Sequence, residues 1–71
     1  MKLFIIFFNN NGNRKLAIDM NNTPISQLDN NMSRLINGIC VRNGYTFSYH
    51  SLKDNDVLLK NIPILALDMF N

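Results

Sequence analysis

The sequence predicts a single α+β domain, in which one helix packs on one face of a mixed sheet of four to five strands. Three observations lead to this prediction: apolar residues alternate with a period of two near the N-terminus, an apolar stripe of helical spacing follows, and two later turn sequences bracket further strands. At 71 residues, the chain has room for one domain, 1–71. A domain this small buries only about 60% of the surface that its unfolded chain exposes, so every apolar face is needed.

The first two strands are expected at residues 1–8 and 14–20. In the first, Leu3, Ile5 and Phe7 fall on one face, and Phe4, Ile6 and Phe8 fall on the other. The link between the strands is rich in asparagine and contains Gly12, and both residue types tolerate the positive φ angles of a hairpin loop. These residues therefore predict a β-hairpin.

A helix is expected at residues 24–36. Thr23 is a suitable N-cap, and Pro24 fits the first helical position, where its missing N–H costs nothing. The apolar residues that follow are three or four positions apart: Ile25, Leu28, Met32 and Leu35. Asn37-Gly38 is a natural stop. We expect the stripe to cover the sheet face that carries Leu3, Ile5 and Phe7.

The second half of the chain is expected to add another hairpin and a final strand. Residues 39–41 would form a strand that turns at Asn43-Gly44, the strongest short hairpin signal. In the next strand the aromatic residues alternate with polar ones: Tyr45, Phe47 and Tyr49. Residues 53–56 would then form a turn, and residues 57–59 would open the final core strand.

Composition excludes several classes of site. One cysteine, Cys40, cannot form an intrachain disulfide or a cysteine-based metal cluster, and His50 is the single histidine, so neither a metal nor a cofactor is expected. The net charge is +2, and the basic residues are scattered: Lys2, Arg14, Lys15, Arg34, Arg42, Lys53 and Lys60. Nucleic-acid binding usually needs a basic stripe, so weak nucleic-acid binding is only a third functional alternative.

The N-terminal apolar run does not resemble an export signal or a membrane span. It covers residues 3–8, shorter than the roughly 7–15 residues of a signal-peptide core. It is also far below the roughly 18–20 residues that cross a bilayer. With no paired cysteines, a reducing compartment is expected, either the cytoplasm or the plastid stroma, and no membrane partner.

Three short motifs within residues 1 to about 60 resemble those of a known family. Val41-Arg42-Asn43-Gly44 is similar to its strand and turn, and Thr23–Leu28 resembles its T-x-x-x-L helix start. Ser51–Val57 resembles its L-x-D-G-D-x-V segment, with Asn55 where glycine is usual, and asparagine tolerates the left-handed conformation. The chain thus resembles the ThiS/MoaD sulfur-carrier family, which implies the ubiquitin-like β-grasp fold.

The resemblance implies a ThiS-like carrier role in thiamine thiazole biosynthesis. In that family a C-terminal Gly-Gly is adenylated by a partner and converted to a thiocarboxylate. The partner here would be a larger enzyme, such as a ThiF-type adenylyltransferase or a thiazole synthase. This chain ends Asp68-Met69-Phe70-Asn71 instead. Either the carrier role is lost, or the end is processed, or the tail, residues 62–71, binds differently.

No catalytic residue is expected, so the chain is not predicted to be an enzyme. Cys40 and His50 are not expected to meet, and Asp54 with Asp56 is interpreted as a turn. The predicted partner-binding residues lie on the sheet face away from the helix and in the tail: Phe4, Ile6, Phe8, Leu58, Ile62, Met69, Phe70 and Asn71. Alternatively, residues 62–70 fold back over that face. The alternative function is a non-catalytic ubiquitin-like interaction or inhibitory module.

Overall fold

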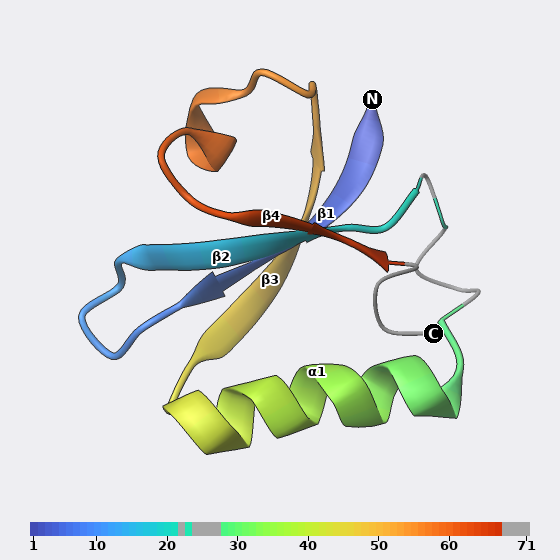
Figure 1. Ribbon diagram of the computed structural model, residues 1–71, viewed down its shortest axis with the longest axis vertical. Helices are drawn as coiled ribbons and strands as arrows, with labels where there is room; N and C mark the ends of the chain where they lie inside the picture. Colours follow the sequence, from blue (N-terminus) through green and yellow to red (C-terminus); the bar gives the residue numbers. More distant parts are fainter. Residues whose placement is uncertain (22, 24–27, 68–71) are drawn as a thin grey trace.

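The computed structural model describes residues 1–21, 23 and 28–67. It confirms the α+β class, with a four-stranded mixed sheet and one α-helix (Figure 1). The elements, in chain order, are β1 (Lys2–Phe8), β2 (Arg14–Asp19), α1 (Asn30–Asn43), β3 (Thr46–Leu52), a 3-10 helix (Val57–Leu59) and β4 (Ile64–Ala66).

The strands lie in the order β3-β1-β2-β4. β1 runs antiparallel to both of its neighbours, so Ile5 lies opposite Ile18 on one side and Tyr49 on the other. β2 and β4 form the parallel pair that makes the sheet mixed. The register of β1 with β2 shifts between Phe7 and Phe8, whereas its register with β3 is continuous from end to end. The outer strands of the described sheet are therefore β3 and β4.

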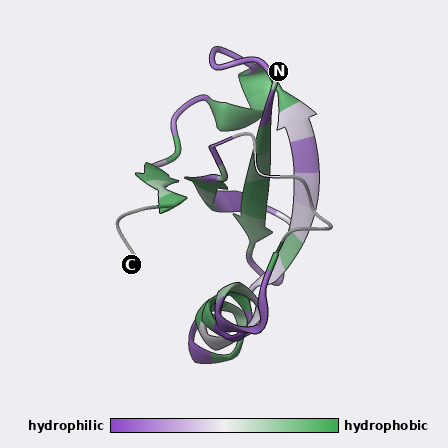
Figure 2. Cartoon of the chain, turned by 90° about the vertical axis from the view of Figure 1, so that its right-hand side faces the viewer, coloured by the Kyte–Doolittle hydropathy of each residue, from purple (hydrophilic) through white to green (hydrophobic). Residues whose placement is uncertain are grey.

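The helix covers the face of the sheet that the sequence predicts. Beneath it the fully buried side chains form the inner core: Ile5, Phe7, Ile18, Met20 and Ile36. Leu3, Leu16 and Phe47 of the strands pack around this core, as do Met32 and Ile39 of α1. The helix lies below the strands in Figure 1 and is seen nearly end-on in Figure 2.

The predicted bounds of the helix are wrong. It runs to Asn43, so residues 39–41 are helical and Asn37-Gly38 lies in its interior. Its N-cap is Asp29, whose carboxylate accepts the Met32 N–H at 2.8 Å. Residues 24–27 lie outside the described residues. Asn-Gly is a stop signal for helices as well as a hairpin turn, because Gly44 at φ 71° can form a left-handed C-cap.

Two glycine substitutions test these bounds. Gly44→Ala places a side chain at positive φ and should lower the free energy of unfolding by about 1–2 kcal/mol. Gly38→Ala meets no atom within 4 Å and should raise it by about 0.5–1 kcal/mol. Urea denaturation of both variants beside the parent chain measures these changes. A helix that stopped at Gly38 would reverse the order of the two effects.

The region after the helix is only partly as predicted. The strand expected at residues 45–50 is confirmed as Thr46–Leu52, but it pairs with β1 and not with residues 39–41. The turn at residues 53–56 is confirmed by the Asp56 N–H, which donates to the Lys53 carbonyl at 3.1 Å. Residues 57–59, expected to be a strand, form a 3-10 helix capped by the Asp56 carboxylate. The final strand follows Pro63, whose carbonyl accepts the Ala17 N–H at 3.0 Å.

Candidate interaction surface

The sheet face opposite the helix gathers the predicted residues but is not open. Phe4 is 2% exposed and Ile6 is 0% exposed, and they form an outer core with Ala17, Leu52 and Leu59. The predicted residues Phe8, Leu58 and Ile62 pack against this core and are partly buried. Phe4 and Ile6, at the centre of this face, are therefore not exposed as expected. Packing in the outer core explains why these positions are apolar.

The cover over this face comes from the segment between β3 and β4. Among the described residues, it consists of the 3-10 helix and the loop to Ile62, which is the first residue of the predicted tail. Binding of a partner by Phe4, Ile6, Phe8, Leu58 and Ile62 stays a prediction, but the first two offer almost no surface for it. The predicted tail residues lie outside the described residues: Met69, Phe70 and Asn71.

Arg14 attaches this cover to the sheet. One nitrogen of its guanidinium donates to three backbone carbonyls: Leu58 at 2.6 Å, Val57 at 3.2 Å and Lys60 at 3.2 Å. These carbonyls lie at the C-terminal end of the 3-10 helix, where a cation is favourable, and that of Val57 also accepts the Lys60 N–H. The charge of Arg14 therefore has a structural role, and this contact joins residues more than 40 positions apart.

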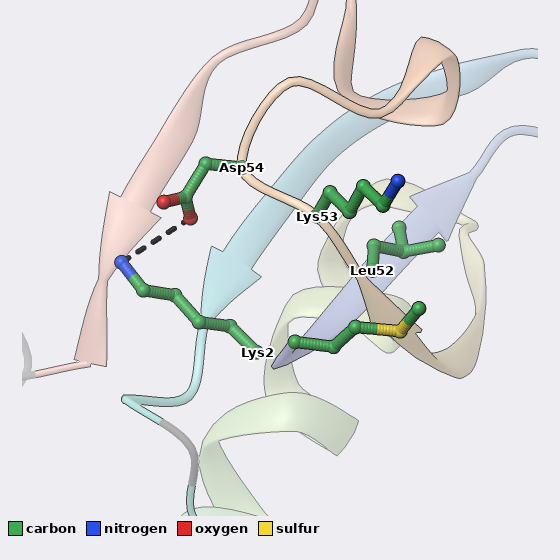
Figure 3. Close-up of a pocket in the computed structure, with 5 residues that line it drawn as sticks. Lys2, Leu52, Lys53 and Asp54 are labelled. Atoms are coloured by element: carbon green, nitrogen blue, oxygen red, sulfur yellow. Dashed lines mark ion pairs between the residues drawn. The ribbon is translucent and has the colours of Figure 1, made fainter.

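A shallow hollow of about 300 Å³ lies at the N-terminal end of β1 (Figure 3). It is lined by Met1, Lys2, Leu52, Lys53 and Asp54. Lys2 and Asp54 point toward one another, with 3.2 Å between Nζ and Oδ1, and Lys2 is 3.8 Å from Asp19. The hydrogen bond and charge of Asp54, aided by Asp19, raise the pKa of Lys2 above 10.5. The charge of Lys2 is thus already compensated by two carboxylates.

Cys40 and His50 lie on opposite sides of the sheet. Cys40 packs on the inner core, whereas His50 lies opposite Phe4 in the strand pair and so on the outer face. They do not form a nucleophile and base. The predicted lack of contact between them rested on a hairpin that does not exist, because Cys40 is on α1. His50 instead shares a 2.6 Å hydrogen bond with the Ser48 hydroxyl.

We expect the Cys40 thiol to react slowly. Burial raises its pKa above 9.0, and the thiolate is the reactive form. At pH 8 it should react with a disulfide reagent several-fold more slowly in the folded chain than in urea. Val41→Cys in a Cys40→Ser background is the matched control, because Val41 is 85% exposed. Equal rates for the two folded proteins would contradict the burial of Cys40.

The free edge of β3 is the functional feature that sequence analysis missed. The Met20 N–H donates to the Leu3 carbonyl at 2.9 Å, which directs the backbone groups of Leu3, Ile5 and Phe7 toward β2. The alternate residues of β1 then bond to β3. In β3 the residues bonded to β1 alternate with residues whose N–H and C=O groups point outward: Phe47, Tyr49 and Ser51. No strand of the described chain lies on that side.

The two edges of the sheet differ in their protection against further pairing. β4 is only three residues long and follows Pro63. β3 is seven residues long, has no bulge against β1, and contains neither proline nor a charged Lys, Arg, Asp or Glu side chain. Short strands, prolines, bulges and lysines are the devices that usually block an edge. The sequence signal for this edge was a run of residues that alternate with a period of two and include none of these protective features.

The described residues hold no other grouping that suggests chemistry. Among them no three acidic, histidine or cysteine side chains come together as a metal site would require. None of the helices in this part of the chain is long and apolar enough to cross a membrane. Comparison with known proteins gives no match to any family model, curated protein or solved structure. The edge of β3 is therefore the feature on which a functional proposal can be built.

Proposed function

We propose that the chain is a non-catalytic protein-interaction module that binds by adding a strand to the edge of β3. The observation that supports this proposal is the row of outward N–H and C=O groups on Phe47, Tyr49 and Ser51. Main-chain hydrogen bonds supply affinity in this mode of recognition, and alternate side chains supply specificity.

The side chains beside this edge suit such binding. Tyr49, 36% exposed, meets the ring of Phe47 edge-on, with 5.6 Å between the ring centroids, so the two rings offer an apolar strip on the helix side. On the other side, Ser48 and His50 offer hydrogen-bonding groups. An added strand would thus find aromatic contacts on one face and polar contacts on the other.

Selection of extended peptides from a random display library tests the proposal. Peptides that bind should shift the amide resonances of Phe47, Tyr49 and Ser51 more than those of β4. Ser51→Pro should weaken them at least about tenfold, because it removes an outward N–H without removing a bond to β1. Ser33→Ala, on the exposed helix surface, is the control and should bind normally. A library that yields no binder dependent on this edge, although the chain is monomeric under the conditions of selection, would overturn the proposal.

A ThiS-like sulfur carrier is the second candidate. The support for it is that one helix on a four-stranded mixed sheet is compatible with the β-grasp (ubiquitin-like) fold of that family. Against it, Val41–Gly44 is the end of a helix and not a strand and turn. Incubation with ATP and a ThiF-type enzyme should add the mass of an adenylate to the C-terminus, and a sulfide source added to the mixture should then replace the adenylate with sulfur, giving a thiocarboxylate and AMP. An unchanged intact mass would contradict this role.

A further inference from the structure

We infer that the strand added to β3 is β3 of a second copy of this chain, so that two copies form one continuous sheet. This inference rests on the proposed function and names its partner. In the pairing that we propose, the two strands run antiparallel about a two-fold axis at Tyr49. Tyr49 then faces Tyr49 of the second copy, and Phe47 faces Ser51.

The register follows from the outward backbone groups. Phe47, Tyr49 and Ser51 are evenly spaced, with Tyr49 at the midpoint of Thr46–Leu52. A two-fold axis at Tyr49 therefore lets each of these residues exchange both of its backbone hydrogen bonds with an outward residue of the other copy. A shift of two residues in either direction leaves the outward groups of one residue in each copy without a partner. The symmetric register is thus the one that satisfies the whole edge.

The charges of β3 favour a second copy over a charged partner. An isologous interface places each residue of a strand near identical residues, so any charged side chain near the axis would face its own kind. β3 contains no Lys, Arg, Asp or Glu, although the chain as a whole carries a net charge of +2. Two identical strands therefore meet without repulsion.

The side chains also match across the axis. On the helix side, the two Tyr49 rings meet at the centre, and each copy adds the ring of Phe47 with which its Tyr49 is already in contact. On the outer face, Ser48 of one copy lies opposite His50 of the other. Each copy already joins these two side chains at 2.6 Å, so the pairs would form one polar cluster across the interface.

Sedimentation equilibrium of the full chain tests the association. At about 0.5 mM the parent chain should have about twice the mass of one 8.2 kDa chain and dissociate on dilution, as mass action requires. Tyr49→Lys places two like charges at the axis and should raise the dissociation constant at least about tenfold. Val41→Lys, an exposed change on α1, is the matched control and should leave it unchanged.

Disulfide trapping tests the register. In a Cys40→Ser background, Tyr49→Cys should give a covalent dimer on mild oxidation, because residues of a hydrogen-bonded pair have Cα atoms about 5.5 Å apart, within the range that a disulfide spans. Ser51→Cys is the control. It is also exposed at the edge but lies opposite Phe47, so it should form no covalent dimer under the same conditions.

The outcomes separate this inference from the function on which it rests. A monomer at about 0.5 mM overturns the inference, and so does a dimer that Ser51→Pro and Tyr49→Lys leave intact. If edge-dependent peptides still bind that monomer, strand addition stands and only the identity of the partner is wrong. If neither peptides nor a second copy bind at β3, both proposals fail. A dimer that both variants weaken supports both.

Discussion

Replacement of Phe4 by aspartate is expected to leave the chain unfolded at 25 °C. Phe4 is 2% exposed and lies in the outer core with Ile6 and Leu59. Loss of a buried phenylalanine alone costs about 3–5 kcal/mol. A buried carboxylate without a partner adds several kcal/mol more. A domain of this size has a free energy of unfolding of roughly 4–10 kcal/mol, so the variant has no stability left.

Circular dichroism and urea denaturation would measure this loss. The matched control is Val57→Asp, which places the same charge in the segment that covers Phe4. Val57 is 71% exposed, so its substitution should change the free energy of unfolding by no more than about 0.5 kcal/mol. A Phe4→Asp variant that folds like Val57→Asp would show that the outer face is open after all. If it unfolds, any loss of partner binding that it shows reports unfolding and not a lost contact.

The N-terminal half of the sheet was predictable because its signals are local. Successive residues of β1 alternate between its two faces, and the link to β2 is a short loop that contains Gly12. The burial of both faces did not follow from this pattern. A strand with apolar residues on both faces is covered twice, and only the tertiary structure identifies Leu58, Leu59 and Ile62 as the second cover.

The helix was predicted correctly in kind but not in position. Two N-terminal signals compete, Thr23-Pro24 and Asp29, and two stop signals compete, Asn37-Gly38 and Asn43-Gly44. Local rules rank these pairs almost equally. The helix extends because Ile39 and Cys40 pack against the inner core, and a helix that ended at residue 36 would lose this burial energy.

The candidate site could not be predicted because it depends on strand order. Residues 45–50 were expected to form a strand, and the lack of Lys, Arg, Asp and Glu in residues 46–52 was visible in the sequence. Their pairing with β1 could not be predicted, because residues 39–41 were expected to form the strand that pairs with them in a hairpin. With that strand present, β3 would have had a neighbour from its own hairpin. The helical end of α1 at Asn43 instead leaves β3 at the edge of the sheet.

Substitution of Arg14 by alanine should lower the free energy of unfolding by about 2 kcal/mol. A hydrogen bond to a charged group contributes roughly 1.5–3 kcal/mol. The lower part of this range applies because two of the three carbonyl contacts of Arg14 are solvent-exposed. In a domain of this size that loss lowers Tm by about 8–16 °C. Lys15→Ala is the matched control, because it removes the same charge from an adjacent exposed residue. It should change the free energy by less than about 0.5 kcal/mol.

Hydrogen exchange would show where the Arg14→Ala variant loses stability. The Leu59 N–H, bonded to Asp56, and the Lys60 N–H, bonded to Val57, should exchange faster, because Arg14 no longer holds this segment against β2. The exchange rates of the amides that join β1 to β3 should change only as far as the global stability of the chain changes. If Arg14→Ala behaves like Lys15→Ala, the carbonyl contacts contribute nothing and apolar packing alone holds the cover. A local loss at residues 59 and 60 would instead show that the outer core opens separately from the helix side, exposing Phe4 and Ile6 without unfolding of the sheet.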